Sequence, residues 1–382
     1  MEFVKFFISK ILKGLLCVLY IFPLNKNKVL FYPINGNYYC NLKYIDIFLR
    51  REYKNINIIW ITKEKNFIKE DINFYKRNSI LFFYHIMTSK VILSNSGLPS
   101  YIKKRKGQVY IETWHGGGAY KKIDVVYKNI KNKFERKRRL NKLNDIDYVI
   151  SSCKRFSEVF KMDTDIKNVD FLAYGMPRND IFFSKEKLEK FSKKIYDRYN
   201  IDQEKKIILY APTFRNHHFY NNLDIDGILE SLYIKFKIKY IFMVRCHPHI
   251  VNKIFEQNNE KNIIDVSSYV DMQELLCATD ILITDYSSCM WDFSLMYKPC
   301  FIYANDLKEY KEERNFHTPI YEWPFPIATN NVELRNNILY FDQNRYIKKV
   351  IEHQKKLGSY ETGNASRKIG ELINFICIGD EK

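Results

Sequence analysis

Short apolar runs alternate with polar or amphipathic stretches along most of the chain. A first series of expected strands covers residues 28–33, 56–62, 90–95, 108–113 and 147–152, and a second covers residues 205–212, 239–248, 262–267, 280–285 and 299–304. Strands buried on both faces read as continuous apolar runs, and their alternation with helix-length segments is typical of parallel βαβ units. The pattern therefore predicts an α/β protein with two Rossmann-like domains.

A charged stretch separates the two series of strands. Residues 184–206 carry lysines and glutamates around apolar positions at helical spacing, which predicts a surface helix that leads into the second domain. A chain of 382 residues also exceeds what one hydrophobic core usually supports. We expect an N-terminal domain over residues 26–183, a C-terminal domain over 184–345, and helices over 346–382 that pack back toward the N-terminal domain.

The first 25 residues combine strong hydrophobicity with lysines. Their uninterrupted apolar run, 14–22, is far shorter than the ~20 residues that a membrane-spanning helix needs, and no small-residue cleavage site follows it. At helical spacing one side carries Lys5, Ser9, Lys10, Lys13 and Tyr20, and the other carries Phe3, Phe6, Ile11, Leu15 and Phe22. This pattern favours an in-plane, peripheral anchor on the cytoplasmic face of the membrane over the alternative, a helix packed on its own protein.

The net charge and the cysteine content limit the classes of ligand and partner that this protein can bind. Lysine and arginine total 62 against 44 acidic residues, and the net charge of +18 attracts polyanions or an anionic membrane surface. A non-enzymatic polyanion-binding protein is therefore one alternative, but no RNA- or DNA-binding motif is visible, and we expect no nucleic-acid partner. The eight cysteines lack the spacing of a zinc site. We expect no metal and no cofactor.

Polar clusters follow several of the predicted strands. In open parallel sheets, ligands bind outside the carboxyl ends of the strands. The clusters at such positions are TWHGGG, APTFRNHH, RCHPH and TDYSS. Each of them is a candidate for ligand binding.

Three of these clusters belong to the second domain. A helix that starts near Ser287 and Ser288 offers free backbone N–H groups and a positive dipole end to a phosphate, although Asp285 or Ser287 could instead cap that helix. Thr213, Arg215 and Arg245 add hydroxyl and guanidinium groups that suit phosphate oxygens, as does His247. The second domain is therefore expected to bind a nucleotide diphosphate.

The fourth cluster places His115 before three glycines in the first domain. Without Cβ atoms, Gly116, Gly117 and Gly118 let the backbone approach a ligand closely. Histidine can accept a proton from an attacking hydroxyl at neutral pH, or it can contact a phosphate, and the residues leave both roles open. Neither a G-x-x-x-x-G-K-[ST] loop nor a G-x-S-x-G elbow is present.

Five blocks together, WHGGGAYKK, AYGMPRNDIF, YAPTFR, RCHP and LITDYSSCMWDF, resemble the signature blocks of the CDP-glycerol glycerophosphotransferase family. The resemblance implies a GT-B architecture, in which two Rossmann-like domains face a central cleft. It implies catalytic roles for His115 and His247. It also implies donor binding by Thr213, Arg215, Arg245, Thr284, Asp285, Ser287, Ser288 and Arg314, and an acceptor-side role for Gly116, Gly117 and Lys121.

The resemblance also implies a reaction. A membrane-associated transferase of this family moves glycerol phosphate, or another alditol phosphate, from a CDP-alditol to a hydroxyl of a polyprenyl-linked glycan acceptor and releases CMP, in teichoic acid or capsule synthesis. The alternative is a GT-B glycosyltransferase that uses a nucleotide sugar. The alditol, the acceptor glycan, the distinction between primase and polymerase, and the choice between a monomer and a homo-oligomer stay open.

Overall fold

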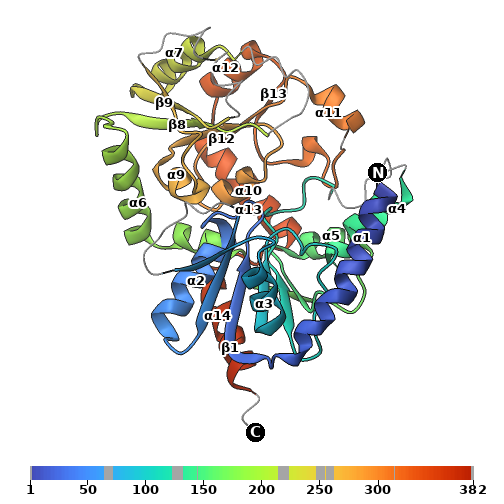
Figure 1. Ribbon diagram of the computed structural model, residues 1–382. Helices are drawn as coiled ribbons and strands as arrows, with labels where there is room; N and C mark the ends of the chain where they lie inside the picture. Colours follow the sequence, from blue (N-terminus) through green and yellow to red (C-terminus); the bar gives the residue numbers. More distant parts are fainter. Residues whose placement is uncertain are drawn as a thin grey trace. The chain divides into compact units, whose positions relative to one another are not determined.

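The computed structural model describes residues 2–63, 72–122, 132–143, 145–213, 223–246, 254, 262–313 and 315–379 (Figure 1). Contacts divide the chain into two compact units. Unit 1 contains Met1–Gly116, Ile123–Asp180 and Tyr360–Lys382, and unit 2 contains Gly117–Lys122 and Ile181–Ser359. Each unit has its own parallel sheet, and the two are described separately.

Unit 1 is built on a sheet of seven strands that pair in the order β3-β2-β1-β4-β5-β6-β7, all parallel. The strands are β1 (Asn25–Tyr32), β2 (Asn57–Thr62), β3 (Asn73–Lys76), β4 (Ser89–Ser94), β5 (Val109–Glu112), β6 (Tyr148–Ile150) and β7 (Asp170–Leu172). The order reverses between β1 and β4, which is the switch point where ligands bind in such sheets.

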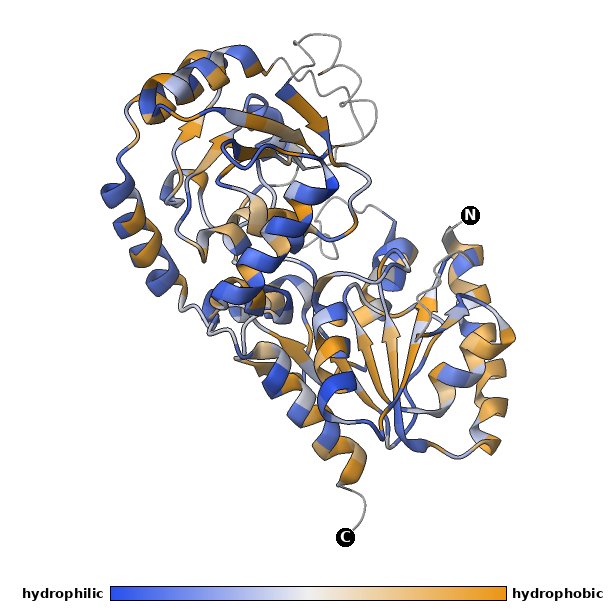
Figure 2. Cartoon of the chain, turned by 90° about the vertical axis from the view of Figure 1, so that its left-hand side faces the viewer, coloured by the Kyte–Doolittle hydropathy of each residue, from blue (hydrophilic) through white to orange (hydrophobic). Residues whose placement is uncertain are grey.

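Helices cover both faces of this sheet. On one face α2 (Cys40–Glu52) and α14 (Ala365–Ile378) lie side by side and bury a core that includes Phe31 and Trp60, whose rings stack 4.9 Å apart. On the other face α3 (Ile80–Thr88) packs against β1, β3 and β4. Since side chains alternate across a strand, both faces of the inner strands are apolar (Figure 2).

Unit 2 repeats the arrangement with six parallel strands in the order β10-β9-β8-β11-β12-β13. Its strands are β8 (Lys206–Tyr210), β9 (Tyr240–Val244), β10 (Ile263–Asp265), β11 (Ile281–Thr284), β12 (Cys300–Tyr303) and β13 (Ile327–Ala328). Its α-helices include α6 (Lys185–Arg198), α7 (Ile225–Phe236), α9 (Met272–Ala278), α10 (Cys289–Ser294), α11 (Leu307–Glu313), α12 (Asn331–Leu339) and α13 (Gln343–Leu357). The switch point of this sheet lies between β8 and β11.

The ten strands predicted from apolar runs are all present, and the structure adds β3, β7 and β13. These three lie at sheet edges, and their residues are mostly half-buried or exposed. Their short stretches of half-buried and exposed residues leave no continuous apolar run to detect, whereas β10, which also lies at a sheet edge, was expected from its apolar run. The predicted helix between the two series is α6, which begins after Ser184, whose hydroxyl accepts a hydrogen bond from the Lys187 N–H.

The N-terminal segment forms α1 (Glu2–Leu15) and the 3₁₀ helix η1 (Leu16–Ile21). Phe6 is buried against Phe134 of α4 (Lys133–Leu140), and the Ser9 hydroxyl lies 3.0 Å from that of Ser100. The expectation that Phe6 lies on the outward apolar side and Ser9 on the polar side is therefore wrong, because α4 supplies an aromatic partner for α1. Along the described chain, no helix has both the length and the apolar character to cross a membrane.

The C-terminal helices divide between the units. Helix α13 belongs to unit 2, whereas α14 belongs to unit 1. The Asp180 carboxylate accepts hydrogen bonds from the Ala365 and Ser366 N–H groups, at 2.9 and 2.7 Å, and so caps the start of α14. Residue 180 thus fixes where the last helix of unit 1 begins.

Gly175 lies beside this return of the chain. Its φ of +83° is in the left-handed region, and a Cβ there would lie 2.9 Å from the Tyr360 carbonyl oxygen and 2.8 Å from Glu361 Oε2. Glycine is required for both reasons.

We expect Gly175→Ala to lower the free energy of unfolding by about 1–3 kcal/mol. An alanine is strained at this positive φ, and its methyl group would lie too close to the Tyr360 carbonyl oxygen. Gly14→Ala is the matched control, since no atom lies within 4 Å of a Cβ at that exposed helical position; it should be neutral or stabilising by up to about 1 kcal/mol. Denaturant titration of both variants measures the difference. Equal stabilities would contradict this account.

Candidate functional site

The His115 side chain is exposed on the loop that follows β5. Its Nδ1 atom is 2.7 Å from the Asn95 carbonyl oxygen, which follows β4. A carbonyl oxygen can only accept, so this hydrogen bond assigns the proton to Nδ1 and the lone pair of the neutral ring to Nε2. The imidazole is therefore arranged to accept a proton through Nε2.

Two buried side chains hold the backbone of this loop. Asn41, at the start of α2, donates from Nδ2 to the Thr113 and Trp114 carbonyls, both at 3.0 Å. The Arg178 guanidinium donates to the His115 carbonyl at 2.7 Å. Sequence analysis missed both residues as part of the site. Arg178 stands in the PRND part (residues 177–180) of the AYGMPRNDIF block and could have been suspected, whereas nothing in the sequence marks Asn41.

The carboxylate of Glu112 also binds the backbone of this loop. It is fully buried and accepts hydrogen bonds from the Trp114 N–H, the Gly97 N–H and the Tyr110 hydroxyl, each at 2.9 Å. Burial raises the pKa of Glu112 from 4.5 to about 7, and the three donors oppose that rise. Glu112 therefore links the loops after β4 and β5 and changes charge near neutral pH.

The rest of the PRND block is structural. Asn179 donates to Glu361 Oε1 at 3.0 Å, and the Met176 N–H donates to Glu361 Oε2 at 2.9 Å. Together with the cap that Asp180 provides, these bonds attach the C-terminal part of unit 1 to the segment that carries Arg178.

The glycines after His115 approach a tryptophan. A Cβ at Gly117 would lie 2.3 Å from Trp291 Cδ1, and one at Gly118, whose φ is +68°, would lie 3.1 Å from Trp291 Cε3. We expected this freedom to serve a ligand, but the close approach that the structure shows is to Trp291 of α10. Sequence analysis missed Trp291, although it stands in the quoted LITDYSSCMWDF block.

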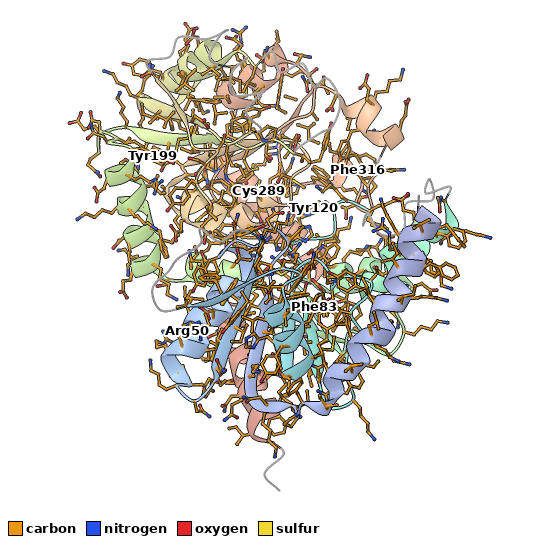
Figure 3. All side chains as sticks on the ribbon, in the orientation of Figure 1. Arg50, Phe83, Tyr120, Tyr199, Cys289 and Phe316 are labelled. Atoms are coloured by element: carbon orange, nitrogen blue, oxygen red, sulfur yellow. The ribbon has the colours of Figure 1, made fainter. Side chains whose placement is uncertain are left out.

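The segment Gly117–Lys122 packs as part of unit 2. The Tyr120 ring contacts Trp323 at 5.1 Å, its hydroxyl lies 3.1 Å from His353 Nε2, and Lys121 forms an antiparallel bridge with Phe316 (Tyr120 and Phe316 are labelled in Figure 3). Burial lowers the pKa of His353 to about 4, so this histidine is neutral.

The predicted donor residues Thr213 and Asp285 meet at the switch point of unit 2. Asp285 accepts from the Thr213 N–H at 2.8 Å and from its hydroxyl at 2.7 Å, and the Thr284 hydroxyl donates to the Ala211 carbonyl at 2.7 Å. Thr284 and Asp285 are buried. Their polar atoms therefore join the loops after β8 and β11.

Ser287 and Ser288 follow on the same loop and are half-buried. Ser288 precedes α10 without a capping hydrogen bond from its side chain, and the Cys289 N–H is 3.5 Å from Ser287 Oγ. Arg245, after β9, directs its guanidinium to the Tyr269 and Val270 carbonyls, at 3.3 Å each.

Three predicted site residues, Arg215, His247 and Arg314, lie outside the described residues. Among the residues that are described, no group of three or more His, Cys, Asp and Glu side chains is placed to hold a metal ion.

The profile of the family described as CDP-Glycerol:Poly(glycerophosphate) glycerophosphotransferase matches residues 15–374, nearly the whole chain. The chain belongs to this glycerophosphotransferase family. The expected family and type of enzyme are thereby confirmed.

Similar proteins agree with this assignment. The chain is 32% identical to a teichoic acid poly(glycerol phosphate) polymerase from Staphylococcus epidermidis over 88% of its own length but only 49% of that protein, so it spans about half of that polymerase. It is 36% identical to a teichoic acid glycerol-phosphate primase from Bacillus subtilis over 77% of this chain and 74% of the primase.

A solved structure of the same family shows the same fold. A variant of the wall teichoic acid polymerase TagF, soaked with CDPG, superposes with a TM-score of 0.84 and 26% identity over the whole of this chain and 98% of that one. The expected fold class, α/β with GT-B architecture and two Rossmann-like parallel sheets, is confirmed.

The raised pKa of Glu112 predicts a pH-dependent stability. Between about pH 4.5 and about pH 7 the folded protein keeps a proton on Glu112 that the unfolded chain has released, so this contribution is present at the acid end and is lost as the pH rises through about 7. Relative to Glu112→Gln, the wild type should therefore become less stable across that range in thermal unfolding.

Tyr110→Phe is a second variant for this test. It removes the hydroxyl that stabilises the carboxylate, so the loss of stability should move to higher pH. A difference between the wild type and Glu112→Gln that stays constant from pH 5 to pH 8 would contradict the assignment.

Proposed function

We propose that this protein transfers glycerol phosphate from CDP-glycerol to a hydroxyl of a lipid-linked acceptor in teichoic acid synthesis and releases CMP. The observation that carries the proposal is the His115 imidazole, which donates from Nδ1 to the Asn95 carbonyl and keeps its lone pair on Nε2. Family membership and the printed names of the relatives support the substrate and the pathway class.

The proposed step is a phosphoryl-type transfer. The acceptor hydroxyl oxygen bonds to the phosphorus that carries glycerol, the bond from that phosphorus to the oxygen of CMP breaks, and CMP leaves with the electron pair. The hydroxyl proton passes to Nε2 of His115. Such reactions depend mainly on positioning the two reactants and on neutralising the charge of the phosphates. A base beside the acceptor hydroxyl helps further because it removes the proton as the new bond forms.

The donor is proposed to bind at the switch point of unit 2. Ser287 and Ser288 are half-buried and stand where the chain passes from β11 into α10, so their hydroxyls and the N–H groups of this turn suit a pyrophosphate. Thr213, Thr284 and Asp285 shape the loops around it. The family resemblance adds Arg215, Arg245, His247 and Arg314 as donor contacts, and Gly116, Gly117 and Lys121 on the acceptor side.

Replacing His115 tests the proposed base. His115→Ala should lower the rate of CMP release from CDP-glycerol by about 10²–10⁴-fold, because no group remains to take the proton, while the Kd for CDP-glycerol in calorimetry changes little. His115→Gln keeps a polar side chain that does not accept a proton at neutral pH, and it should be equally slow.

The outcomes separate the alternatives. A Gln variant that restores turnover, or an Ala variant that mainly weakens donor binding, would make His115 a phosphate contact instead of a base. Release of UDP from UDP-sugars, with no CMP from CDP-glycerol, would overturn the proposed function in favour of a nucleotide-sugar glycosyltransferase.

We further propose that α1 and η1 hold the protein peripherally at the cytoplasmic face of the membrane. The outward side of α1 is apolar, with side chains 49–61% exposed at Phe3, Val4, Phe7, Ile8, Ile11 and Leu15. Lysines flank them, and the basic helix α4 packs alongside. This combination suits an anionic bilayer surface.

The anchor is attached firmly to unit 1. The Arg105 guanidinium donates to the carbonyls of Phe22 and Tyr20, at 2.8 and 3.1 Å, and lies over the Tyr20 ring at 4.7 Å. The exposed apolar side is therefore held in place on a docked helix.

The double variant Ile8→Ser and Ile11→Ser tests the anchor. Burying an isoleucine side chain is worth roughly 1.5–3 kcal/mol, so binding to anionic vesicles in a sedimentation assay should weaken by about tenfold or more. Ile234→Ser with Val332→Ser is the matched control, because these residues are equally exposed on α7 and α12 of unit 2. Unchanged sedimentation of the first variant, or an equal loss in the control, would contradict the proposal.

A further inference from the structure

Side chains from two distant parts of unit 1 converge on the backbone around His115. The carbonyls of three consecutive residues, Thr113, Trp114 and His115, all accept hydrogen bonds from Asn41 or Arg178. Thr113 is fully buried and Trp114 is half-buried, so carbonyls in this part of the loop need partners within the protein, and two side chains supply donors to three successive carbonyls.

Arg178 is buried despite its charge, with 4% of its surface exposed. It donates to the His115 carbonyl at 2.7 Å, and it also lies 3.3 Å from Cys40 Sγ. A guanidinium is a strong and rigid donor, so it fixes the direction of the one peptide carbonyl that belongs to the proposed base itself.

Asn41 is fully buried and uses both ends of its amide. Its Oδ1 accepts from the Arg178 N–H at 3.2 Å, while its Nδ2 donates to the two carbonyls that precede His115. Since the two ends face partners of opposite type, the amide orientation is determined by the network. Asn41 and Arg178 therefore act on the loop as one connected group.

The backbone of this loop needs such support. Trp114 has a φ of +52°, a left-handed conformation that a bulky residue rarely adopts without external contacts. This turn brings the next residue, His115, to the Asn95 carbonyl. If the turn relaxed toward the extended region, the imidazole would leave Asn95, and the hydrogen bond that places the proton on Nδ1 would be lost.

We propose that Arg178 and Asn41 are positioning residues for His115: by binding three successive carbonyls they hold the Trp114 turn, and thereby keep the Nδ1–H tautomer and the direction of Nε2. This inference rests on the proposed function for its effect on the reaction. Its structural part concerns the resting protein alone.

The test combines kinetics with ¹⁵N NMR of the histidine rings, assigned with His115→Gln. Arg178→Ala and Asn41→Asp should shift the His115 signals away from the Nδ1–H tautomer. They should also lower kcat for CMP release about 10²-fold with KM for CDP-glycerol changed less than about twofold, because a displaced base impairs the step and not donor binding. Arg178→Lys should recover part of kcat, since it restores one donor.

Asp180→Ala is the matched control. Asp180 lies two residues from Arg178 in the same motif, and its carboxylate caps the start of α14. Its replacement should lower Tm but leave the His115 signals and kcat within about twofold of the wild type.

The outcomes are distinguishable. If the wild-type protein released no CMP from CDP-glycerol, the proposed function would be wrong. The NMR comparison of the variants would still show whether Arg178 and Asn41 hold the His115 ring in place. The inference is overturned if the Arg178 and Asn41 variants keep both signals and kcat, or if Asp180→Ala reduces kcat as strongly as they do. If Arg178→Ala does not fold, Arg178→Lys decides alone: unchanged His115 signals and kcat would overturn the inference.

Discussion

The parallel pairing of every strand is the constraint on which the structure depends. Because all strands of one sheet run in the same direction, their carboxyl ends meet at one edge, and the loops that follow them become neighbours. In unit 1 this brings Asn95 and His115 together, and in unit 2 it brings Thr213 to Asp285. The order and direction of the strands thus place these loops next to each other within each unit, whatever side chains the loops carry.

The motifs that mark the family serve mainly to hold loops in position. In unit 1, Arg178, Asn179 and Asp180 reach the His115 loop, Glu361 and the start of α14 respectively. In unit 2, the Asp285 carboxylate accepts hydrogen bonds from Thr213 in the loop after β8. Residues that actually contact substrates are expected to be few, and buried polar residues around them keep their geometry fixed, which suits a transfer reaction that depends on positioning.

Glycine and aromatic residues have a related role beside His115. Gly117 and Gly118 allow the backbone to lie against Trp291, and Tyr120 packs among Trp323 and His353. The segment that begins at Gly117 therefore packs as part of unit 2, while His115 itself is held by hydrogen bonds in unit 1. Burial keeps His353 neutral, so its contact with Tyr120 does not depend on charge near neutral pH.

The sequence by itself determined the inner strands of both sheets, the edge strand β10, the helix α6, the family and the clusters that end the strands, because continuous apolar runs and local motifs consist of adjacent residues. It did not reveal the edge strands β3, β7 and β13, which lack a fully apolar run, nor did it show that Phe6 faces inward. Only the tertiary structure decided that Asn41, Glu112 and Arg178 surround the His115 loop and that Trp291 requires the glycines. Those contacts join residues up to 174 positions apart, as between Gly117 and Trp291, and no local pattern indicates which distant partner will satisfy a buried polar group or fill the space beside a glycine.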